Sequence, residues 1–228
     1  MNKANILFHS FFFLLFSIFF YGKSFAEPMN LAAFKHHLMT YHDSGEYAKE
    51  MKEVMDVAEH FLIQKSKKNS KNHFALVLDI DETCLSNYDN LLARDFANDL
   101  NRIHIDTLKG NATAIPACQH LFKVAQQNHV DVFFISGRYE QERKVTEENL
   151  KNAGFTGWKD LILQPDSNFG KHGTVQPFKI QARKQLEEQG YTVLASIGDQ
   201  YSDLKGGYAL RTFKLPNPYY STLPKPVS

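Results

Sequence analysis

Short apolar runs alternate with amphipathic stretches along most of this chain. Runs typical of buried strands lie at 74–78, 131–135, 161–163 and 192–197, and a last short strand is expected at 211–215. Between them, helices are expected at 116–127, 140–153 and 176–189. Pro116 opens the first helix, and Gly154 and Gly190 follow the other two, where a helix end favours glycine. Strands that alternate with helices predict an α/β fold with a doubly wound, Rossmann-like parallel sheet.

The residues before this pattern predict one further helix. Between 47 and 62, apolar side chains recur at steps of three and four, which places them on one helical face. Asp43 and Glu46 are expected to cap its start. Residues 27–43 look irregular, 65–71 resemble a solvated basic linker, and 86–112 look irregular and partly helical.

Length and composition indicate a single globular domain. The chain has 228 residues, of which 43% are apolar and 22% charged, and it has neither low-complexity tracts nor internal repeats. A chain of this size can bury a full core without disulfide bonds. We therefore expect residues 27–228 to form one domain with a small insertion.

The first 26 residues have a different character. Lys3 precedes an almost wholly apolar, Phe-rich run at 6–21, and small residues occur at Ser24 and Ala26. This pattern predicts a secretory signal peptide that is cut after Ala26, and hence a periplasmic or secreted protein. A retained membrane anchor is the alternative, because the run is nearly long enough to span a bilayer.

The net charge of the mature chain indicates which partners to expect, and its two cysteines raise the question of a disulfide. Loss of Lys3 and Lys23 with the signal peptide leaves 24 basic against 25 acidic residues, so nothing indicates nucleic acid or an anionic membrane as a partner. Stable membrane association after cleavage is not expected. Cys84 and Cys118 could form a disulfide in an oxidising compartment, or could be two small buried side chains.

Three histidines near the N-terminus do not predict a metal site. His36, His37 and His42 lack a nearby carboxylate or cysteine that would complete a ligand set. We expect them to be solvated.

Acidic and hydroxyl groups follow the predicted strands. Asp79, Asp81 and Thr83 come just after the first strand, Ser136-Gly137-Arg138 after the second, and Asp199 and Asp203 after the fourth. Ligands of an open parallel sheet bind beyond the carboxyl ends of its strands, so these groups should share one crevice.

The chemistry of these groups suits phosphoryl transfer. Asp79 can attack phosphorus, while Asp81 can protonate the leaving oxygen. Ser136 and the N–H groups of Gly137 and Arg138, expected at the start of the next helix, can hold phosphoryl oxygens. Lys179 can neutralise the phosphate, Asp199 can bind Mg²⁺ together with the first two aspartates, and Asp203 can support the metal ligands.

Two competing interpretations of the acidic segment are weaker. A calcium-binding loop starting at Asp79 would need Gly at its sixth position and Glu at its twelfth, where this chain has Cys84 and Asn90. Each acid taken alone could also be a helix cap or a turn residue. All four segments in order, each after a strand or opening a helix, favour a shared site.

These segments resemble the four motifs of the haloacid dehalogenase superfamily. The amino-acid sequences of these segments resemble those of its subfamily IIIB, the class B-type acid phosphatases that include plant vegetative storage proteins. The similar stretches are residues 78–87, 133–138, 178–184 and 197–204. The resemblance covers about residues 73–217. It implies Asp79 as nucleophile and metal ligand, and Asp81 as general acid and base that also binds metal through its backbone carbonyl. It further implies phosphate binding by Ser136, Gly137 and Lys179, a metal-ligand role for Asp199, and one Mg²⁺ per site.

The resemblance also implies a function for the insertion. Residues 86–112 would be a small cap that shapes the leaving-group pocket, with Tyr88 and Phe96 as candidate lining or core residues. Cys84 departs from the small or aliphatic residue expected there. The expected function is an exported, Mg²⁺-dependent acid phosphatase acting on small phosphate monoesters through an aspartyl-phosphate. A phosphotransferase using the same intermediate and a storage or binding protein of low activity are the alternatives.

Overall fold

The structure is a computed structural model that describes residues 28–67 and 73–222. The predicted signal peptide lies outside the described residues, as does most of the predicted linker. Within the described ranges no helix combines the length and the apolar character needed to cross a membrane.

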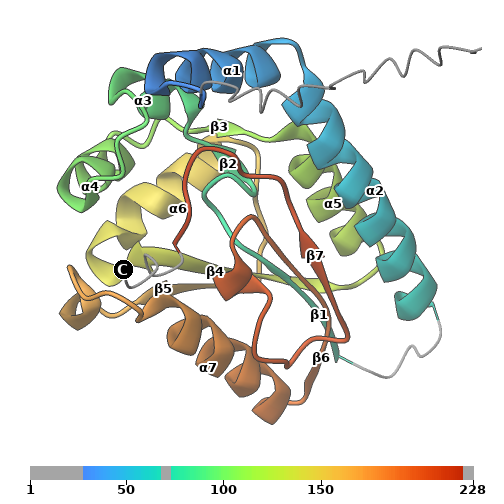
Figure 1. Cartoon of the computed structure of the whole chain (residues 1–228). Helices are drawn as coiled ribbons and strands as arrows, with labels where there is room; N and C mark the ends of the chain where they lie inside the picture. Colours follow the sequence, from blue (N-terminus) through green and yellow to red (C-terminus); the bar gives the residue numbers. More distant parts are fainter. Residues whose placement is uncertain (1–27, 68–72, 223–228) are drawn as a thin grey trace, which may run out of the picture.

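A five-stranded parallel sheet forms the centre of the molecule (Figure 1). Its spatial order is β5-β4-β1-β6-β7, so the first strand of the chain lies in the middle. The bounds are β1 His73–Leu78, β4 Asp131–Tyr139, β5 Asp160–Gln164, β6 Tyr191–Gly198 and β7 Arg211–Lys214. All four neighbouring pairs are parallel. The predicted doubly wound α/β fold is confirmed.

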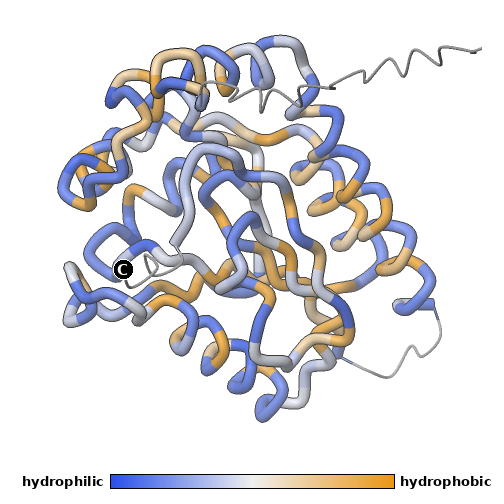
Figure 2. Tube along the Cα trace, in the orientation of Figure 1, coloured by the Kyte–Doolittle hydropathy of each residue, from blue (hydrophilic) through white to orange (hydrophobic). Residues whose placement is uncertain are grey.

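Helices cover both faces of the sheet. Leu76 and Leu78 of β1 belong to the larger core with α2 (Glu46–Ser66), α5 (Pro116–Gln127) and α6 (Arg143–Asn152). Ala75 and Val77 point the other way, into a smaller core with α7 (Val175–Glu188). Successive side chains of a strand face opposite sides, which explains why these strands are apolar throughout. Figure 2 shows the same arrangement, with hydrophobic central strands and hydrophilic outer helix surfaces.

The insertion between β1 and α5 forms a small cap at one end of the sheet. It contains α3 (Tyr88–Ala93) and α4 (Leu100–Leu108), and it begins and ends with the short antiparallel strands β2 (Leu85–Ser86) and β3 (Thr113–Ala114). Buried Arg94 after α3 pairs with Asp106 of α4, Nη1 to Oδ2 at 2.6 Å. The expected irregular, partly helical insertion is therefore present and internally braced.

The N-terminal part differs from its prediction. Residues 27–43 were expected to be irregular, but Leu31–Asp43 form α1, whose start is capped by the Asn30 side chain. Leu38 is the one buried residue of α1, so its apolar pattern is too weak to predict a helix. The predicted capping pair of Asp43 and Glu46 is wrong, because Gly45 occupies the N-cap of α2 with a φ of 83° and no side-chain cap. Glycine reaches that left-handed conformation without steric cost.

His42 is also placed differently from its prediction. Instead of lying free in solvent, its ring stacks on Tyr88 of the cap, with ring centroids 3.4 Å apart. Figure 1 shows α1 beside α3 at this end of the sheet. The first helix therefore packs onto the cap.

Three 3-10 turns complete the described elements: η1 (Glu140–Glu142), η2 (Asp166–Asn168) and η3 (Tyr201–Asp203). Cys84 and Cys118 are both buried as free thiols, with their Sγ atoms 2.6 Å apart. Their proximity fits a disulfide as well as two small buried side chains, so both predicted alternatives stay open.

Candidate active site

The carboxyl ends of three neighbouring strands bring the predicted residues together. Leu78, the last residue of β1, is in register with Phe134 of β4 and Ile197 of β6. Asp79 continues this alignment, since its N–H donates to the Ile197 carbonyl at 3.0 Å. The first, second and fourth predicted segments therefore meet at one edge of the sheet.

Three buried carboxylates form the centre of the site. Oxygen atoms of Asp79, Asp199 and Asp203 lie within 4.8 Å of one another. Lys179, on α7, reaches this cluster from the sheet face that α7 covers. Its Nζ is 2.5 Å from Asp79 Oδ1 and 2.6 Å from Asp203 Oδ1. The lysine thus arrives from a helix rather than from a strand end.

Burial and mutual repulsion shift the charges of this cluster. Burial raises the pKa of Asp79 well above its usual value, against the lowering effect of Lys179. Burial likewise raises the pKa of Asp199 to about 7, and Asp203 and Glu82 act in the same direction. Burial would lower the pKa of Lys179, but Asp203 and Asp79 raise it above its ordinary value. The lysine is therefore charged, yet it does not fully offset the three acids.

One oxygen of Asp79 and one oxygen of Asp199 share a single hydrogen-bond donor, the Thr83 hydroxyl. Asp79 Oδ2 and Asp199 Oδ1 each lie 3.3 Å from the Thr83 hydroxyl, which has a single hydrogen to give. Both oxygens of Asp203, in contrast, accept hydrogen bonds, from Lys179 and from the Gln200 N–H. Asp79 and Asp199 thus have acceptor capacity left, while Asp203 mainly holds Lys179 in place.

These features fit a hard divalent cation. The cluster offers only oxygen ligands, is buried, and brings three carboxyl groups together with a single ammonium group. These conditions favour Mg²⁺ or Ca²⁺. Within the described residues this is the one group of three or more His, Cys, Asp or Glu side chains close enough to hold a metal.

Asp81 points away from the carboxylate cluster. Its carboxylate accepts from Arg138 Nη2 at 2.6 Å and Nε at 3.0 Å, and from Asn87 Nδ2 at 2.8 Å. Burial alone would raise the pKa of Asp81, but Arg138 and Asn87 lower it below the usual value. Asp81 is therefore held as an anion by the second predicted segment and by the cap.

The segment Ser136-Gly137-Arg138 does not open a helix as predicted. Strand β4 continues through this segment to Tyr139, beyond the apolar residues 131–135 from which the strand was predicted. The Gln164 side chain donates to the Gly137 carbonyl at 2.8 Å, and the Ser136 hydroxyl accepts from the Arg138 N–H at 3.2 Å. The phosphate-binding role of Ser136 and Gly137 would then rest on an extended backbone, without a helix N-terminus.

Gly198 is required by a close approach at the end of β6. A Cβ at this position would lie 2.1 Å from Asp203 Oδ2 and 2.4 Å from Asp203 Cβ. Any larger residue would push Asp203 away from Lys179. The glycine before Asp199 therefore has a packing function in the site.

Glu82 is a buried acid that the sequence interpretation did not use. It adopts a φ of 53°, and its carboxylate accepts from the Asn87 N–H at 2.8 Å and from the Tyr220 hydroxyl. Burial raises the pKa of Glu82 to about 7, with Asp81 adding to the effect. Glu82 joins the first segment to the cap and to the chain after β7.

Residues 217–222, called here the C-terminal segment, contribute groups that no motif predicted. Asn217 Nδ2 donates to Asp199 Oδ2 at 2.6 Å. Tyr219 packs against Tyr47 of α2 and Tyr88 of the cap. The sequence of this segment, Asn-Pro-Tyr-Tyr-Ser-Thr, has no periodic pattern, so nothing in it indicated a place in the site.

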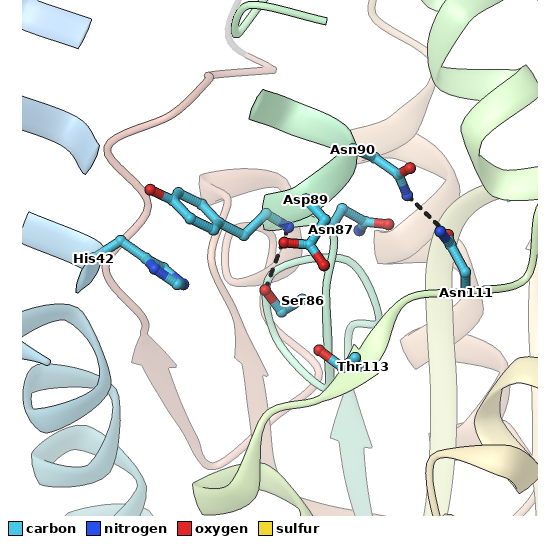
Figure 3. Close-up of a pocket in the computed structure, with 8 residues that line it drawn as sticks. His42, Ser86, Asn87, Asp89, Asn90, Asn111 and Thr113 are labelled. Atoms are coloured by element: carbon cyan, nitrogen blue, oxygen red, sulfur yellow. Dashed lines mark hydrogen bonds between the residues drawn. The ribbon is translucent and has the colours of Figure 1, made fainter. Parts of the chain in front are cut away.

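A small polar cavity of about 100 Å³ lies between the cap and α1 (Figure 3). Figure 3 shows Asn87, Ser86 and Thr113 around it, with Asn90 hydrogen-bonded to Asn111. Asn87 also contacts Asp81, so the cavity begins one side chain away from the predicted general acid. Tyr88 lines this cavity and also packs in the core, whereas Phe96 packs against the core.

Comparisons with known proteins find similar plant proteins. The "Acid phosphatase 1" of Solanum lycopersicum is 36% identical over 151 residues, which are 64% of this chain and 58% of that protein. "Vegetative storage protein 1" of Arabidopsis thaliana is 39% identical over 106 residues, covering 46% of this chain and 38% of that protein. This chain thus matches about half the length of these plant relatives.

A solved structure shares the fold. "The structure of the Class C acid phosphatase from Bacillus anthracis" has a TM-score of 0.67 at 21% identity, and the match covers 82% of this chain and 86% of that one. The family described as HAD superfamily, subfamily IIIB (Acid phosphatase) matches residues 26–223. With the family match spanning nearly the whole described chain, this protein belongs to the subfamily IIIB acid phosphatase family of the HAD superfamily.

Proposed function

We propose that this protein is an exported acid phosphatase that hydrolyses small phosphate monoesters through a phosphoryl group carried on Asp79. The observation that carries the proposal is the buried cluster of Asp79, Lys179 and Asp199 at the strand ends, where two carboxylate oxygens share one hydroxyl donor. Membership of the acid phosphatase family supports the same reaction class.

In the first half-reaction, an oxygen of Asp79 attacks phosphorus and the ester P–O bond breaks. The leaving oxygen takes a proton from Asp81, and Lys179 offsets the charge of the phosphoryl oxygens. In the second, water attacks the phosphorus of the aspartyl-phosphate, gives a proton to Asp81 and releases phosphate, which restores the Asp79 carboxylate. A bound Mg²⁺, held by Asp79 and Asp199 with the Asp81 backbone carbonyl, would neutralise charge on the phosphoryl group.

The surroundings of Asp81 suit its proposed role as general base more directly than its proposed role as general acid. Arg138 and Asn87 keep its carboxylate anionic, the state that can take a proton from water. Donating a proton requires Asp81 to be protonated and released from Arg138. Acidic conditions favour that state, in keeping with an acid phosphatase.

The cavity beside Asn87 supports a polar leaving group. It is lined by carboxamides and hydroxyls, together with His42, Tyr88 and Asp89, and it adjoins the side chain that would protonate the leaving oxygen. A sugar or other hydroxylated alcohol could form hydrogen bonds there that an apolar leaving group could not.

Two other functions use the same fold. A phosphotransferase would pass the phosphoryl group from Asp79 to an alcohol, and adding an alcohol acceptor to the assay distinguishes it by the new ester that forms. A storage protein of low activity is suggested by the likeness to a vegetative storage protein. The complete set of Asp79, Asp81, Lys179 and Asp199 favours catalysis over storage.

The decisive experiment measures phosphate release from a panel of monoesters, with and without a chelator. We expect chelation to abolish turnover and Mg²⁺ to restore it. Asp79→Asn should leave no measurable turnover and no phosphoenzyme, because it lacks the attacking anion. Full activity of the metal-stripped protein, or turnover by Asp79→Asn, would show that this mechanism is wrong.

A further inference from the structure

We infer that Asn217, in the C-terminal segment, is a positioning residue for the metal site: it fixes the Asp199 carboxylate so that Oδ1 is left for the cation. This inference rests on the proposed metal-dependent function. It assigns a part in the site to a residue about 14 positions beyond the last predicted motif residue, Asp203.

The two oxygens of Asp199 have different surroundings. Oδ2 accepts two short hydrogen bonds, from Asn217 Nδ2 and from Gln200 Nε2, both at 2.6 Å. Oδ1 faces the Thr83 hydroxyl, which it shares with Asp79. Two amide donors on one oxygen prevent rotation of the carboxylate, so the oxygen with spare acceptor capacity always faces Asp79.

The orientation of the Asn217 amide is itself determined by the chain that follows. Its Oδ1 accepts from the Tyr219 N–H at 2.8 Å and lies 3.4 Å from the Tyr220 N–H. Because the carbonyl oxygen serves these donors, the NH₂ group must face Asp199. A flipped amide would lose both sets of contacts.

The second carboxamide is oriented in the same way. Gln200 Oε1 accepts from the Thr222 N–H at 2.9 Å, which directs Nε2 to Asp199. Backbone N–H groups of the C-terminal segment therefore orient both amides that hold Asp199.

The C-terminal segment is anchored well enough to do this. The Tyr220 hydroxyl donates to buried Glu82, and the Tyr219 ring packs against Tyr47, Tyr88 and Phe96. Figure 1 shows the red chain continuing from β7 across the end of the sheet on the side where α1 and α3 lie. Asn217 thus sits on a fixed piece of chain between the sheet and the cap.

The test is calorimetric titration of Mg²⁺ into metal-stripped protein, compared between wild type and Asn217→Ala. Loss of a residue that orients a metal ligand typically weakens metal binding about 10–100-fold, and we expect a shift in that range. Saturating Mg²⁺ should restore most of the turnover. Asn217→Ser is the second variant, because serine can still accept the N–H groups of the turn but is too short to reach Asp199.

Tyr219→Phe is the matched control. Within the described part of the chain, its hydroxyl is buried without a hydrogen-bond partner, so its removal changes the same segment without touching Asp199. We expect wild-type Mg²⁺ affinity for this variant. Thermal unfolding in chelator separates a general loss of stability from a loss of metal affinity.

The possible outcomes are distinct. Wild-type affinity in both folded Asn217 variants would overturn the inference and leave the proposed function intact. A wild-type protein that binds no Mg²⁺ would instead contradict the proposed function. Equal weakening in Tyr219→Phe and Asn217→Ala would assign the effect to packing of the segment and overturn the role of the amide.

Discussion

Asp79 and Asp81 are two residues apart and have opposite electrostatic surroundings. Asp79 is buried next to two other carboxylates, and its pKa is raised by burial, whereas Arg138 and Asn87 lower the pKa of Asp81. A strand-to-loop turn separates their side chains, one toward Lys179 and one toward Arg138. The different tasks proposed for the two acids therefore correspond to different environments.

This difference predicts the behaviour of Asp81→Asn. The variant should slow both half-reactions by about 10²–10⁴-fold, the usual contribution of a general acid and base. An activated aryl phosphate needs no proton, so its first step should suffer less and phosphate should accumulate on Asp79. Rapid acid quench followed by peptide mapping would locate the label.

Asp79→Asn is the control, and it should carry no label at all. Label on a histidine or a serine would contradict the mechanism. Asp81→Asn also leaves buried Arg138 without its anionic partner, so circular dichroism should first establish that the variant is folded.

Sequence patterns predicted the acids and the lysine that lie together in the candidate site, but only some of the residues that orient them. Asp79 and Asp199 directly follow strands, so their convergence could be inferred from the fold class, whereas Lys179 lies on a helix and its assignment drew on the family resemblance. Asn217 and Tyr220 lie in an aperiodic segment, and their place depends on tertiary hydrogen bonds to Asp199 and Glu82. Local sequence patterns do not indicate such contacts between residues that are far apart in the chain.

At the scale of elements, strands and the helices of the main domain agree with their predictions, because continuous apolar runs and terminal glycines are local signals. α1 was missed for the opposite reason, since it buries little and is held by contacts such as the stacking of His42 on Tyr88. The extension of β4 through Arg138 was missed because the strand leaves its apolar core before it ends. Both differences arise where tertiary packing outweighs local pattern.

Asp106 of the cap accepts hydrogen bonds from two cationic side chains, so we expect its loss to lower the stability of the protein. Asp106 accepts from Arg94 Nη1 and from Lys109 Nζ, both at 2.6 Å. Asp106→Asn should lower the free energy of unfolding by about 1.5–3 kcal/mol, the range for hydrogen bonds to charged groups. Urea unfolding monitored by circular dichroism would measure the change at pH 7.

The same variant has a defined pH dependence. Burial would raise the pKa of Asp106, but Lys109 and Arg94 lower it below the value of about 3.9 in the unfolded chain. A carboxylate with a lowered folded-state pKa stabilises the protein fully above that unfolded value, and the stabilisation is lost as the pH falls through the folded-state pKa. The difference between wild type and Asp106→Asn should therefore be constant above about pH 5 and shrink below pH 4.

Asp56→Asn provides the matched control, because Asp56 pairs with Lys52 on the exposed surface of α2. An exposed pair of this kind contributes less than about 1 kcal/mol. Equal costs for the two variants would show that the Arg94–Asp106 pair does not brace the cap.

At the scale of the whole molecule, the apolar N-terminal run leads to a prediction about processing. We propose that the signal peptide is cut after Ala26, which would leave Glu27 as the first residue. Mass spectrometry of the protein from its native host should find that terminus in the periplasm or the medium. An intact Met1 terminus in the membrane fraction would favour a retained anchor.

The site also draws on residues that are synthesised at very different times. Asp79 lies near the first strand, whereas Asn217 and Tyr220 come after the last one. At about 5–20 residues per second, a ribosome needs roughly 7–28 s to pass from Asp79 to Asn217. During that interval the nascent chain already carries the proposed nucleophile but lacks the amide that orients Asp199, and for most of it also lacks Asp199 itself. On the proposed mechanism the growing chain is therefore catalytically silent until Asp199 has been synthesised, and its metal site is fully oriented only once Asn217 has followed.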